Sequence, residues 1–528
     1  LQPGKHTLAV SLIDPKTNKV HYSSPPATIS VALSSTFYPD RYYYTREKVA
    51  RIIAAEDISR QPFAHVNIIG ELRDKSGKRL RTGKRVKGKA GRTLFQFDIT
   101  RLKPGDYPLV VTIQDKQGST LQQKQFTLKK RAPAPREVKI DRERLCFLVD
   151  GEPFFPIRFA VNFGSQGILS DHAGEMIDAG LNTMMTFMYD LVGWEKMADT
   201  VPLSEFIQSI RDQLDLYHQA GTMLFFDIGT SVPRRHLWGK PDRRDIMNGK
   251  KPNHPALQKI LDDSRAIIAA IKEHPALFSY RGMDEMGDKG FWITQAVKLN
   301  AARWEIDPYH PMYVIGPGGA ALGAAEAFGT NPGMFDRGSH GPTLIPVDSR
   351  TATQVAQARE KGKAICMVVQ FMASVYQRPS MSPAELRLAT YLELIHGTKG
   401  IGYYASDNAY LTATKPIWDT FIALFREMKQ LSPVLLSESP PQQLETNDPA
   451  LHLLLKEHRG KLYMLAANKT KTELSVAFDV SSLRPDSTVK VLFEKRKLKT
   501  AGTQFRDTLA GYATRVYRAR PAGEAGAR

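Results

Sequence analysis

The spacing of hydrophobic and polar positions divides the chain into three kinds of segment. Up to Lys130, short apolar runs alternate with polar positions, and turn clusters such as Asp74-Lys-Ser-Gly separate the runs. Short strands at this spacing are typical of antiparallel β-sandwiches. The pattern predicts truncated β-sandwich strands over 1–35, an Ig-like β-sandwich over 36–131 and a stiff proline linker over 131–136.

In the middle of the chain, apolar strands alternate with amphipathic helices. The helical pattern is clear over 204–219, where Phe206, Ile210 and Leu214 fall on one face. The strands carry apolar residues without strict alternation, as expected when both faces of a sheet are covered. Eight strands are predicted, at 154–161, 181–188, 222–228, 277–284, 312–317, 328–334, 364–371 and 400–405. Eight strands alternating with helices predict a (β/α)8 TIM barrel over 137–435.

The final segment returns to the strand pattern. Runs such as 451–458 and 461–468 predict a C-terminal β-sandwich over 436–520, and residues 521–528 are expected to be a disordered tail. The predicted fold is therefore multidomain, a TIM barrel with Ig-like β-sandwich domains before it and a β-sandwich after it.

The charge of the chain bears on its partners. Its 528 residues carry a formal net charge of +19, which favours anionic partners. Part of the surplus is local, because residues 72–92 hold ten Lys or Arg against the single Asp74. This segment has no aromatic residue that could stack on bases, so we favour a solvated hairpin and expect no nucleic-acid partner. No run of 18 apolar residues is present, so no membrane span is expected.

Other sequence features limit the class of protein. Cys146 and Cys366 fall in different predicted domains, so a disulfide framework is not expected. No cluster of residues has metal-ligand spacing, and no phosphate-binding loop or Gly-x-Ser-x-Gly elbow occurs, so we expect neither metal nor cofactor. The chain begins at Leu1 without a signal peptide, and its first residues look like the end of a β-domain. We therefore expect a processed or trimmed product of a secreted or periplasmic bacterial protein.

One segment carries the candidate chemistry. Residues 275–287 read as a buried strand that ends in Asp284 and Glu285, and a Gly and a Trp-containing helix follow. Acidic residues at the carboxyl end of a barrel strand lie where such barrels keep their catalytic groups. A neutral carboxyl there can protonate a leaving oxygen, so Glu285 is the candidate general acid. The alternative is a salt bridge at the barrel rim, for example with Arg281.

Three segments resemble the clan-A glycoside hydrolase superfamily over residues 137–520. They are Val149-Asp-Gly-Glu-Pro-Phe-Phe-Pro-Ile ahead of the first strand, His274-Pro-Ala-Leu-Phe-Ser-Tyr ahead of Asp284-Glu285, and His396-Gly-Thr-Lys-Gly-Ile-Gly-Tyr-Tyr at the last strand. The resemblance implies a (β/α)8 barrel that cleaves glycosidic bonds of a poly- or oligosaccharide, with Glu285 as the acid/base. An acidic glycan is among the substrates that the net charge suggests.

The chain departs from the pattern of this superfamily at two positions. Asp284 stands where the superfamily usually has Asn, and the seventh strand ends in Gln370 where its nucleophilic Glu is expected. A retaining mechanism needs a nucleophilic carboxylate about 5–5.5 Å from the acid, and an amide cannot serve. Three explanations stay open. An inverting mechanism could use Asp227 or Asp407 as base, a substrate-assisted mechanism could use Asp284, or the barrel binds glycan without cleaving it.

Several further residues are predicted to bind the sugar. Gln370 is expected to hydrogen-bond a hydroxyl group, with Tyr404 and Asp407 on the last strand and its loop and Asn331 on the sixth strand. Trp238 and Trp292 follow strands three and four and could stack on sugar rings, as could Trp194 after strand two. Arg234, Arg235, Arg243 and Arg244 surround Trp238 and could clamp anionic groups, although a solvated loop is the simpler interpretation.

Some residues of catalytic type have a simpler structural explanation. Ser382-Pro-Ala-Glu385 is the sequence of a helix capping box, so Glu385 is predicted to cap a helix rather than react. Asp227 precedes a loop and could also be a cap. Trp304 and Trp418 fall within predicted helices and are expected in the core.

Overall fold

The computed structural model describes most of the chain in two compact units. The described residues are 4–9, 11–17, 19–31, 36–55, 67–85, 92–160, 171–186, 192–193, 195–197, 199–282, 290–316, 319–330, 345–371, 381–405, 415–439, 444, 448 and 450–522. One unit spans residues 1–133 with 360–362, and the other spans 134–359 with 363–528.

The first unit contains β1 (Gly4–Leu8) paired with β4 (Ala27–Val31), and β2 (Ser11–Ile13) paired with β3 (Val20–Ser23). Two four-stranded antiparallel sheets follow. Their strand orders are β5 (Phe37–Pro39), β6 (Val49–Ala54), β10 (Thr93–Asp98), β9 (Lys84–Arg85), and β12 (Thr120–Lys130), β11 (Gly105–Gln114), β7 (Asn67–Arg73), β8 (Arg79–Thr82). Apolar side chains of both sheets, among them Ile52, Phe97 and Val111, form one buried core. This is the predicted β-sandwich architecture.

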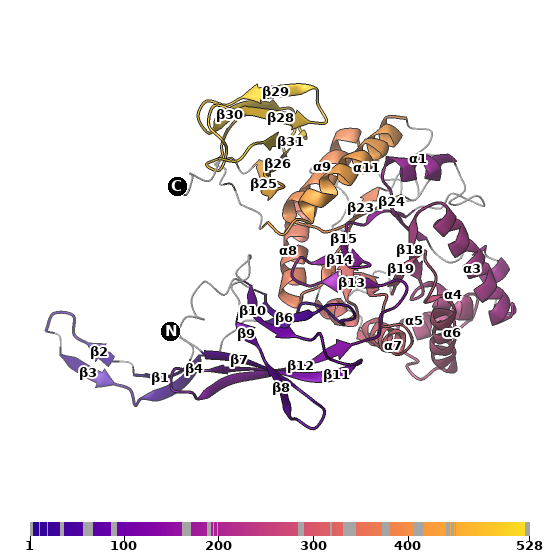
Figure 1. Ribbon diagram of the computed structural model, residues 1–528, viewed down its shortest axis with the longest axis horizontal. Helices are drawn as coiled ribbons and strands as arrows, with labels where there is room; N and C mark the ends of the chain where they lie inside the picture. The colour runs from indigo at the N-terminus through magenta and orange to yellow at the C-terminus, as the bar shows by residue number, and fades with distance from the viewer. Residues whose placement is uncertain are drawn as a thin grey trace. The chain divides into compact units, whose positions relative to one another are not determined.

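The second unit is built on a closed barrel of parallel strands (Figure 1). Its strands in order are β16 (Ile157–Ala160), β17 (Thr183–Thr186), β18 (Met223–Asp227), β19 (Leu277–Arg281), β20 (Met312–Ile315), β21 (Ala327–Gly329), β22 (Ala364–Ile365) with β23 (Met367–Phe371), and β24 (Ile401–Ala405). β22 and β23 form one strand around Cys366, so the barrel has eight strands, each within or close to a predicted range.

Backbone hydrogen bonds of this seventh strand close the ring. The amides of Cys366 and Val368 donate to Phe328 and Thr330 on one side, at 3.0 and 3.2 Å, while the amide of Met367 donates to Gly400 on the other, at 3.2 Å. Alternate residues thus bond to β21 and to β24. The closed parallel barrel confirms the fold that the resemblance to clan-A glycoside hydrolases implies.

Helices surround the barrel, as Figure 1 shows. They are α1 (Asp171–Ala179), α3 (Leu203–Gln219), α4 (Ser231–Leu237), α5 (Arg243–Met247), α6 (Pro255–Ile271), α7 (Gly290–Ile306), α8 (Ile345–Lys361), α9 (Pro383–His396) and α11 (Lys415–Leu435). The predicted apolar face of α3 is buried, with Phe206, Ile210 and Leu214 fully enclosed. Trp418 is buried as predicted, and its indole Nε1 donates to Glu175 at 2.7 Å.

Helix α9 begins with the predicted capping box. The amide of Glu385 donates to Ser382 Oγ at 3.3 Å, and Glu385 Oε2 accepts from the amide of Ser382 at 2.8 Å. Pro383 occupies the first turn, and Gly397 ends the helix with a left-handed φ of 99°. The carboxylate of Glu385 is therefore used in helix capping, as the sequence indicated.

A small antiparallel sheet precedes the barrel and plugs its amino-terminal end. It comprises β13 (Val138–Asp141), β14 (Cys146–Val149) and β15 (Glu152–Phe154). The turn between β14 and β15 has positive φ at Asp150 (51°) and Gly151 (93°), which is the requirement of a type I′ hairpin turn. Phe147 of β14 packs on Phe278 of the barrel, with ring centroids 4.9 Å apart. The Asp-Gly motif therefore shapes a hairpin that closes the bottom of the barrel.

A buried polar cluster stabilises the same end of the barrel. Glu326, just before β21, accepts from Arg303 at 2.7 Å, from the Trp304 indole at 2.6 Å and from the amide of Met312 at 2.8 Å. Burial by itself would raise the pKa of Glu326, but Arg303 and Lys363 with these hydrogen bonds hold it below its ordinary value. Because the cluster lies opposite the carboxyl ends of the strands, we assign it to stability.

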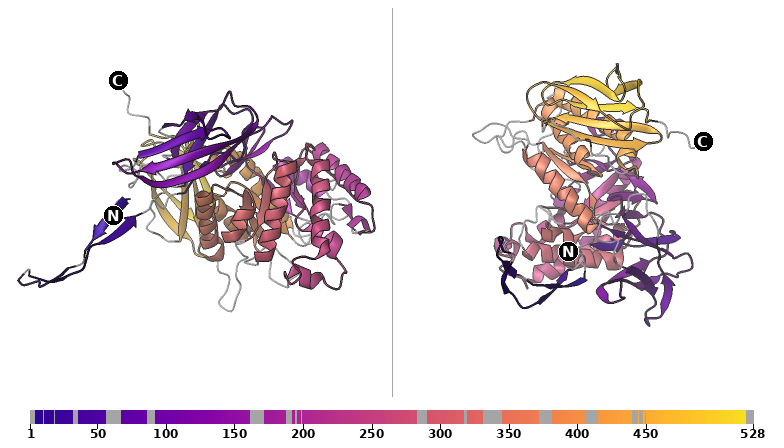
Figure 2. Two further views of the ribbon diagram at one scale, coloured as in Figure 1. Left: turned by 90° about the horizontal axis from the view of Figure 1, so that it is seen from below. Right: turned by 90° about the vertical axis from the view of Figure 1, so that its left-hand side faces the viewer.

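The C-terminal strands form a second sandwich. Its larger sheet has the order β25 (Leu451–His458), β26 (Lys461–Asn468), β31 (Thr514–Ala519), β28 (Thr488–Leu492) and β29 (Arg496–Lys499), and β27 (Leu474–Asp479) pairs with β30 (Gln504–Leu509). These strands lie beside α9 and α11 (Figures 1 and 2). Leu454, Leu465 and Val516 join the barrel's hydrophobic core. Among the described residues, no helix is both long and apolar enough to cross a membrane.

Candidate active site

The interior of the barrel is filled at mid-height by an arginine between two aromatic rings. Arg158 of β16 is fully buried, and its guanidinium carbon lies 4.9 Å from the ring centre of Phe225 and 4.8 Å from that of Tyr313. Arg158 Nη2 donates to the Tyr313 hydroxyl at 3.2 Å, and this hydroxyl donates to the Cys366 carbonyl at 2.9 Å. These residues come from strands one, three, five and seven, the alternate-strand layer typical of TIM barrels.

Glycine on an even-numbered strand leaves room for this layer. A Cβ atom at Gly402 would lie 2.6 Å from Arg158 Nε, too close for any side chain. Burial raises the pKa of the Tyr313 phenol, so this hydroxyl stays protonated as a hydrogen-bond donor. The middle of the barrel is therefore filled by packed side chains. A ligand can reach only the layer nearer the carboxyl ends of the strands.

That upper layer contains a buried ion pair. Arg281, the last residue of β19, places Nη1 3.5 Å from Oδ1 of Asp227, the last residue of β18, and both side chains are almost fully enclosed. The Ser231 hydroxyl and the amide of Thr230, at 3.4 Å, also donate to Asp227. Neighbouring strands thus bring two opposite charges together at the end of the barrel where chemistry is expected.

These contacts give Asp227 a clear structural function. Its carboxylate orients the turn that leads into α4 and balances the charge of Arg281. The alternative interpretation of Asp227 as a turn and cap residue therefore has direct structural support. Its role as a catalytic base stays a prediction, and the carboxylate would have to leave these partners to activate a water.

Several predicted site residues lie outside the described part of the chain. They are Asp284, Glu285, Asn331, Asp407 and Trp194. Gln370 and Trp292 are described in their backbone only, as parts of β23 and α7. Glu285 follows the end of β19 at Arg281 by four residues in the sequence. Its assignment as the general acid therefore stays a prediction.

The barrel brings two predicted binding residues together. Gln370 of β23 and Tyr404 of β24 are direct partners in the parallel register, near the carboxyl ends of both strands. Tyr403, the residue before Tyr404, packs outward against Phe421 of α11, with ring centroids 5.2 Å apart. Because side chains alternate along a strand, Tyr404 faces the barrel interior.

The loop region after β18 matches the predicted aromatic and basic cluster in part. Trp238, at the end of α4, is 53% exposed, and the Arg243 guanidinium lies 4.5 Å from its ring centre. Arg234 is half-buried on the same helix. Arg235 is buried instead, where it donates to the carbonyls of Lys196 and Val201. Arg235 was predicted to clamp anionic groups together with its neighbours. Because its guanidinium is buried and bonded to backbone carbonyls, it stabilises the fold instead.

Sequence reasoning missed Arg158 and Tyr313, the residues on which the upper layer rests. A signal was present, since Arg158 interrupts the apolar run of residues 154–161. An arginine inside a predicted barrel strand has to be buried among the strands, and its partners are then part of the core.

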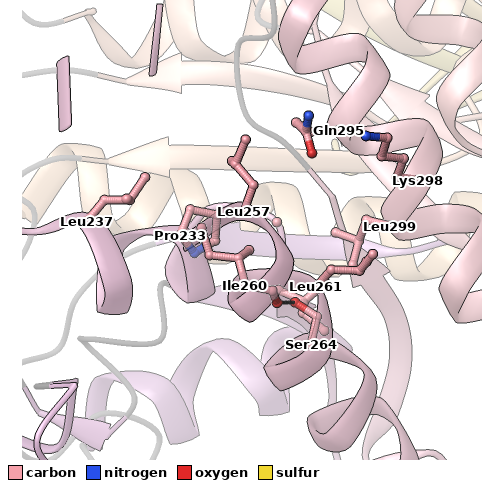
Figure 3. A pocket seen from close by; sticks show the side chains of 11 residues that line it. Pro233, Leu237, Leu257, Ile260, Leu261, Ser264, Gln295, Lys298 and Leu299 are labelled. Carbon is pink, nitrogen blue, oxygen red and sulfur yellow. Dashed lines mark hydrogen bonds between the residues drawn. The ribbon is translucent and has the colours of Figure 1, made fainter. Parts of the chain in front are cut away.

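A separate cavity lies between α4, α6 and α7 (Figure 3). It is lined mainly by apolar side chains, and Pro233, Leu257 and Leu299 point into it. Its volume is about 30 Å³, which holds a water molecule but no sugar ring. We therefore place the candidate site at the barrel mouth and not in this cavity. No cluster of three potential metal ligands occurs among the described residues.

Comparison with known proteins gives likenesses in fold. No protein-family model matches the sequence, and a search of curated proteins gave no match. Among solved structures, an α-amylase from Geobacillus thermoleovorans complexed with acarbose is 10% identical, with a TM-score of 0.48 over 69% of this chain and 98% of that chain. A cyclomaltodextrinase is 9% identical, with a TM-score of 0.48 over 90% of this chain and 98% of that chain.

A glycoside hydrolase family 30 subfamily 8 xylanase from Clostridium acetobutylicum is also among the similar solved structures. It is 12% identical, with a TM-score of 0.41 over 69% of this chain and 95% of that chain. At such identities and TM-scores, substrate and mechanism stay open.

Proposed function

We propose that the protein is a glycoside hydrolase that cleaves glycosidic bonds of a poly- or oligosaccharide, with Glu285 as general acid. The observation that carries the proposal is the Asp227–Arg281 pair, which puts buried charge at the carboxyl ends of β18 and β19. Catalytic groups of TIM barrels come from these strand ends. Glu285 lies four residues after the end of β19 in the sequence.

In this proposal each residue at the mouth has a distinct role. Glu285 protonates the leaving oxygen, Gln370 and Tyr404 hydrogen-bond sugar hydroxyl groups, and Arg281 is held in place by Asp227. An amide at Gln370 excludes it as a nucleophile, so a retaining route with a strand-seven carboxylate is not available. Asp407 or Asp227 as base gives an inverting reaction, and Asp284 gives a substrate-assisted one.

A panel of neutral and acidic glycans tests the proposal. The wild-type protein is expected to release reducing ends from at least one glycan, and the anomer formed first distinguishes inversion from retention. Quantification of reducing ends together with NMR of the fresh product provides both measurements. Binding to a glycan without any release would contradict the proposal.

A second function, glycan binding without cleavage, is favoured by two observations. Strand seven carries Gln370 in place of a carboxylate, and the carboxylate of Asp227 is occupied by Arg281, Ser231 and Thr230. The same panel separates the two functions, because a binding protein gives saturable binding with no product.

Trp238 is expected to form a sugar subsite at the rim. Its ring is 53% exposed on the segment after β18. The Trp238→Ala substitution should raise KM about tenfold and leave kcat nearly unchanged, because stacking of an aromatic face contributes about 0.5–1.5 kcal/mol. Initial rates on a soluble oligosaccharide measure both constants. Phe493→Ala is the control, since Phe493 is 40% exposed on the C-terminal sandwich and should leave KM unchanged.

A further inference from the structure

A row of cations crosses the five-stranded C-terminal sheet at right angles to its strands. Arg518 of β31 pairs in register with Lys490 of β28, and Lys490 pairs with Lys497 of β29. On the other side, Arg518 pairs with Tyr463 of β26, which pairs with Lys456 of β25. Residues opposite each other in register project from the same face of a sheet. We call Arg518, Lys490 and Lys497 the cationic row.

Part of this face is covered by the barrel and part is open to solvent. Leu454, Leu465 and Val516 lie two residues away on the same face and pack into the barrel core. The Lys456 ammonium is buried at this contact and donates to the carbonyls of Leu435 and Ser437, at 3.2 and 3.0 Å. Toward the sheet edge, Lys490 and Lys497 are exposed, so the cationic row runs outward from the barrel contact.

The charges of the cationic row have no partner within the described residues. Two carboxylates of this sandwich serve other arginines, because Glu494 pairs with Arg496 and Arg515 and Asp507 pairs with Arg496. Residues 451–520 hold 15 Lys or Arg against 6 Asp or Glu, a surplus of nine within a chain of net charge +19. Residues directly opposite on neighbouring strands have Cβ atoms about 4.5–5.5 Å apart, and like charges at such positions destabilise a sheet. A bound polyanion removes this repulsion.

We propose that the cationic row docks an anionic polysaccharide. Neighbouring strands lie about 4.8 Å apart, so the backbone positions of the three residues repeat along one line at about that interval. A linear polymer with carboxylate or sulfate groups on successive sugars can contact all three, whereas a small anion reaches only one or two. Arg518 offers a planar guanidinium for two-pronged contact with such a group. The proposal deepens the proposed function by naming the class of polymer, and it rests on that function.

The surroundings of the cationic row favour a polysaccharide over a nucleic acid. Sites for single-stranded nucleic acid interleave cations with exposed aromatic rings on which bases stack. The aromatic residue in register with the cationic row is Tyr463, which is half-buried beside Lys456. Duplex DNA is therefore a competitor that the experiment must include.

Binding of the full chain to defined polymers tests the proposal. Polygalacturonate, a sulfated polysaccharide, neutral amylose and duplex DNA are titrated at low and at physiological ionic strength. We expect the two anionic polysaccharides to bind, and to bind more weakly as salt rises. Lys490→Glu should weaken polygalacturonate binding about tenfold, because it removes the central cation of the row and the new carboxylate pairs with the two neighbouring cations.

The control variant is Lys75→Glu, an exposed position in the basic 72–92 segment with the same change in net charge. It should leave polygalacturonate binding within about twofold, since Lys75 is not part of the cationic row. Lys490→Glu should melt no earlier than the wild type, because it replaces repulsion with attraction across the sheet. A lower melting temperature of Lys490→Glu would therefore show that its loss of binding comes from misfolding. That result would contradict the assignment of the cationic row.

Three results would overturn the docking proposal. They are an equal loss of binding in Lys75→Glu, tighter binding of DNA than of polygalacturonate at equal salt, and no binding of either anionic polysaccharide. Reducing-end release is measured separately, so the two proposals can fail independently. Cleavage of a neutral glycan without polyanion binding would contradict only the proposal of a docking surface. Polyanion binding without cleavage of any glycan would contradict only the proposal of a glycoside hydrolase.

Discussion

Glu285→Gln is expected to lower kcat on a natural glycan by about a thousandfold while the Kd for that glycan stays unchanged. The amide keeps the shape of the side chain but cannot donate the proton that the leaving oxygen needs, and general acid catalysis contributes about 10²–10⁴-fold in rate. Reducing-end release at saturating substrate measures kcat, and titration of the variant with the same glycan measures Kd.

The leaving group distinguishes a general acid from a residue that only supports the site. A nitrophenolate departs without protonation, so Glu285→Gln should retain kcat on a nitrophenyl glycoside to within about tenfold of the wild type. Glu385→Gln is the matched control, because Glu385 caps α9 and should keep full kcat on both substrates. Equal losses of Glu285→Gln on both substrates, or full activity on the natural glycan, would remove Glu285 from the role of acid.

Glu326→Gln is expected to destabilise the barrel by about 3–5 kcal/mol, because loss of one member of a buried ion pair leaves the other charge uncompensated. Arg303 is fully buried and lies 2.7 Å from Glu326, so its guanidinium cannot turn to water in the variant. The amide also cannot accept hydrogen bonds from Arg303, Trp304 and Met312 together as a carboxylate does. The midpoint of urea unfolding, followed by tryptophan fluorescence, measures the loss.

An exposed pair between α6 and α7 is the control for this prediction. Arg265 and Glu305 are also 2.7 Å apart, but their side chains are 38% and 63% exposed. Glu305→Gln should therefore change the free energy of unfolding by less than about 1 kcal/mol. Equal effects of Glu305→Gln and Glu326→Gln would contradict the prediction. They would show that burial does not determine how much the Glu326–Arg303 pair contributes to the free energy of unfolding.

The Glu326 effect also has a defined pH dependence. The pKa of Glu326 is held below the ordinary value of 4.5 in the folded protein. A carboxyl with a lowered folded pKa stabilises the protein above its unfolded pKa, and this stability is lost as pH falls through the folded pKa. The difference in unfolding free energy between wild type and Glu326→Gln should thus be full near neutral pH and shrink below about pH 4.5.

The fold was predictable because its signals are local. The strand predicted over 222–228 is observed as Met223–Asp227. The strand predicted over 364–371 is observed as Ala364–Ile365 with Met367–Phe371. The capping box at Ser382 and Glu385 formed as predicted, since its hydrogen bonds join residues three apart. Periodicity and capping involve only near neighbours in the chain, so they can be read without tertiary structure.

The position of the candidate site was predictable from the sequence. The side chains that contact the site residues were not. The sequence placed Asp227 at the end of a barrel strand, and the structure agrees. Its ion pair with Arg281 depends on β18 lying next to β19, and the layer of Arg158 and Tyr313 depends on closure of the ring. Arg235 was expected in a clamp and is buried, because the packing of α4 decides which of two adjacent arginines faces the core.

By itself, the sequence determined the order of strands and helices and the capping of α9. It also determined that the candidate acid, Glu285, follows the carboxyl end of β19. Only the tertiary structure decided which charges meet. Lys490, Lys497 and Arg518 form a row because the sheet order places β28 between β31 and β29, although β31 is the last of these strands in the chain. Local propensity depends on neighbours in sequence, whereas pairing of distant charges depends on strand order and burial, which arise only when the chain packs as a whole.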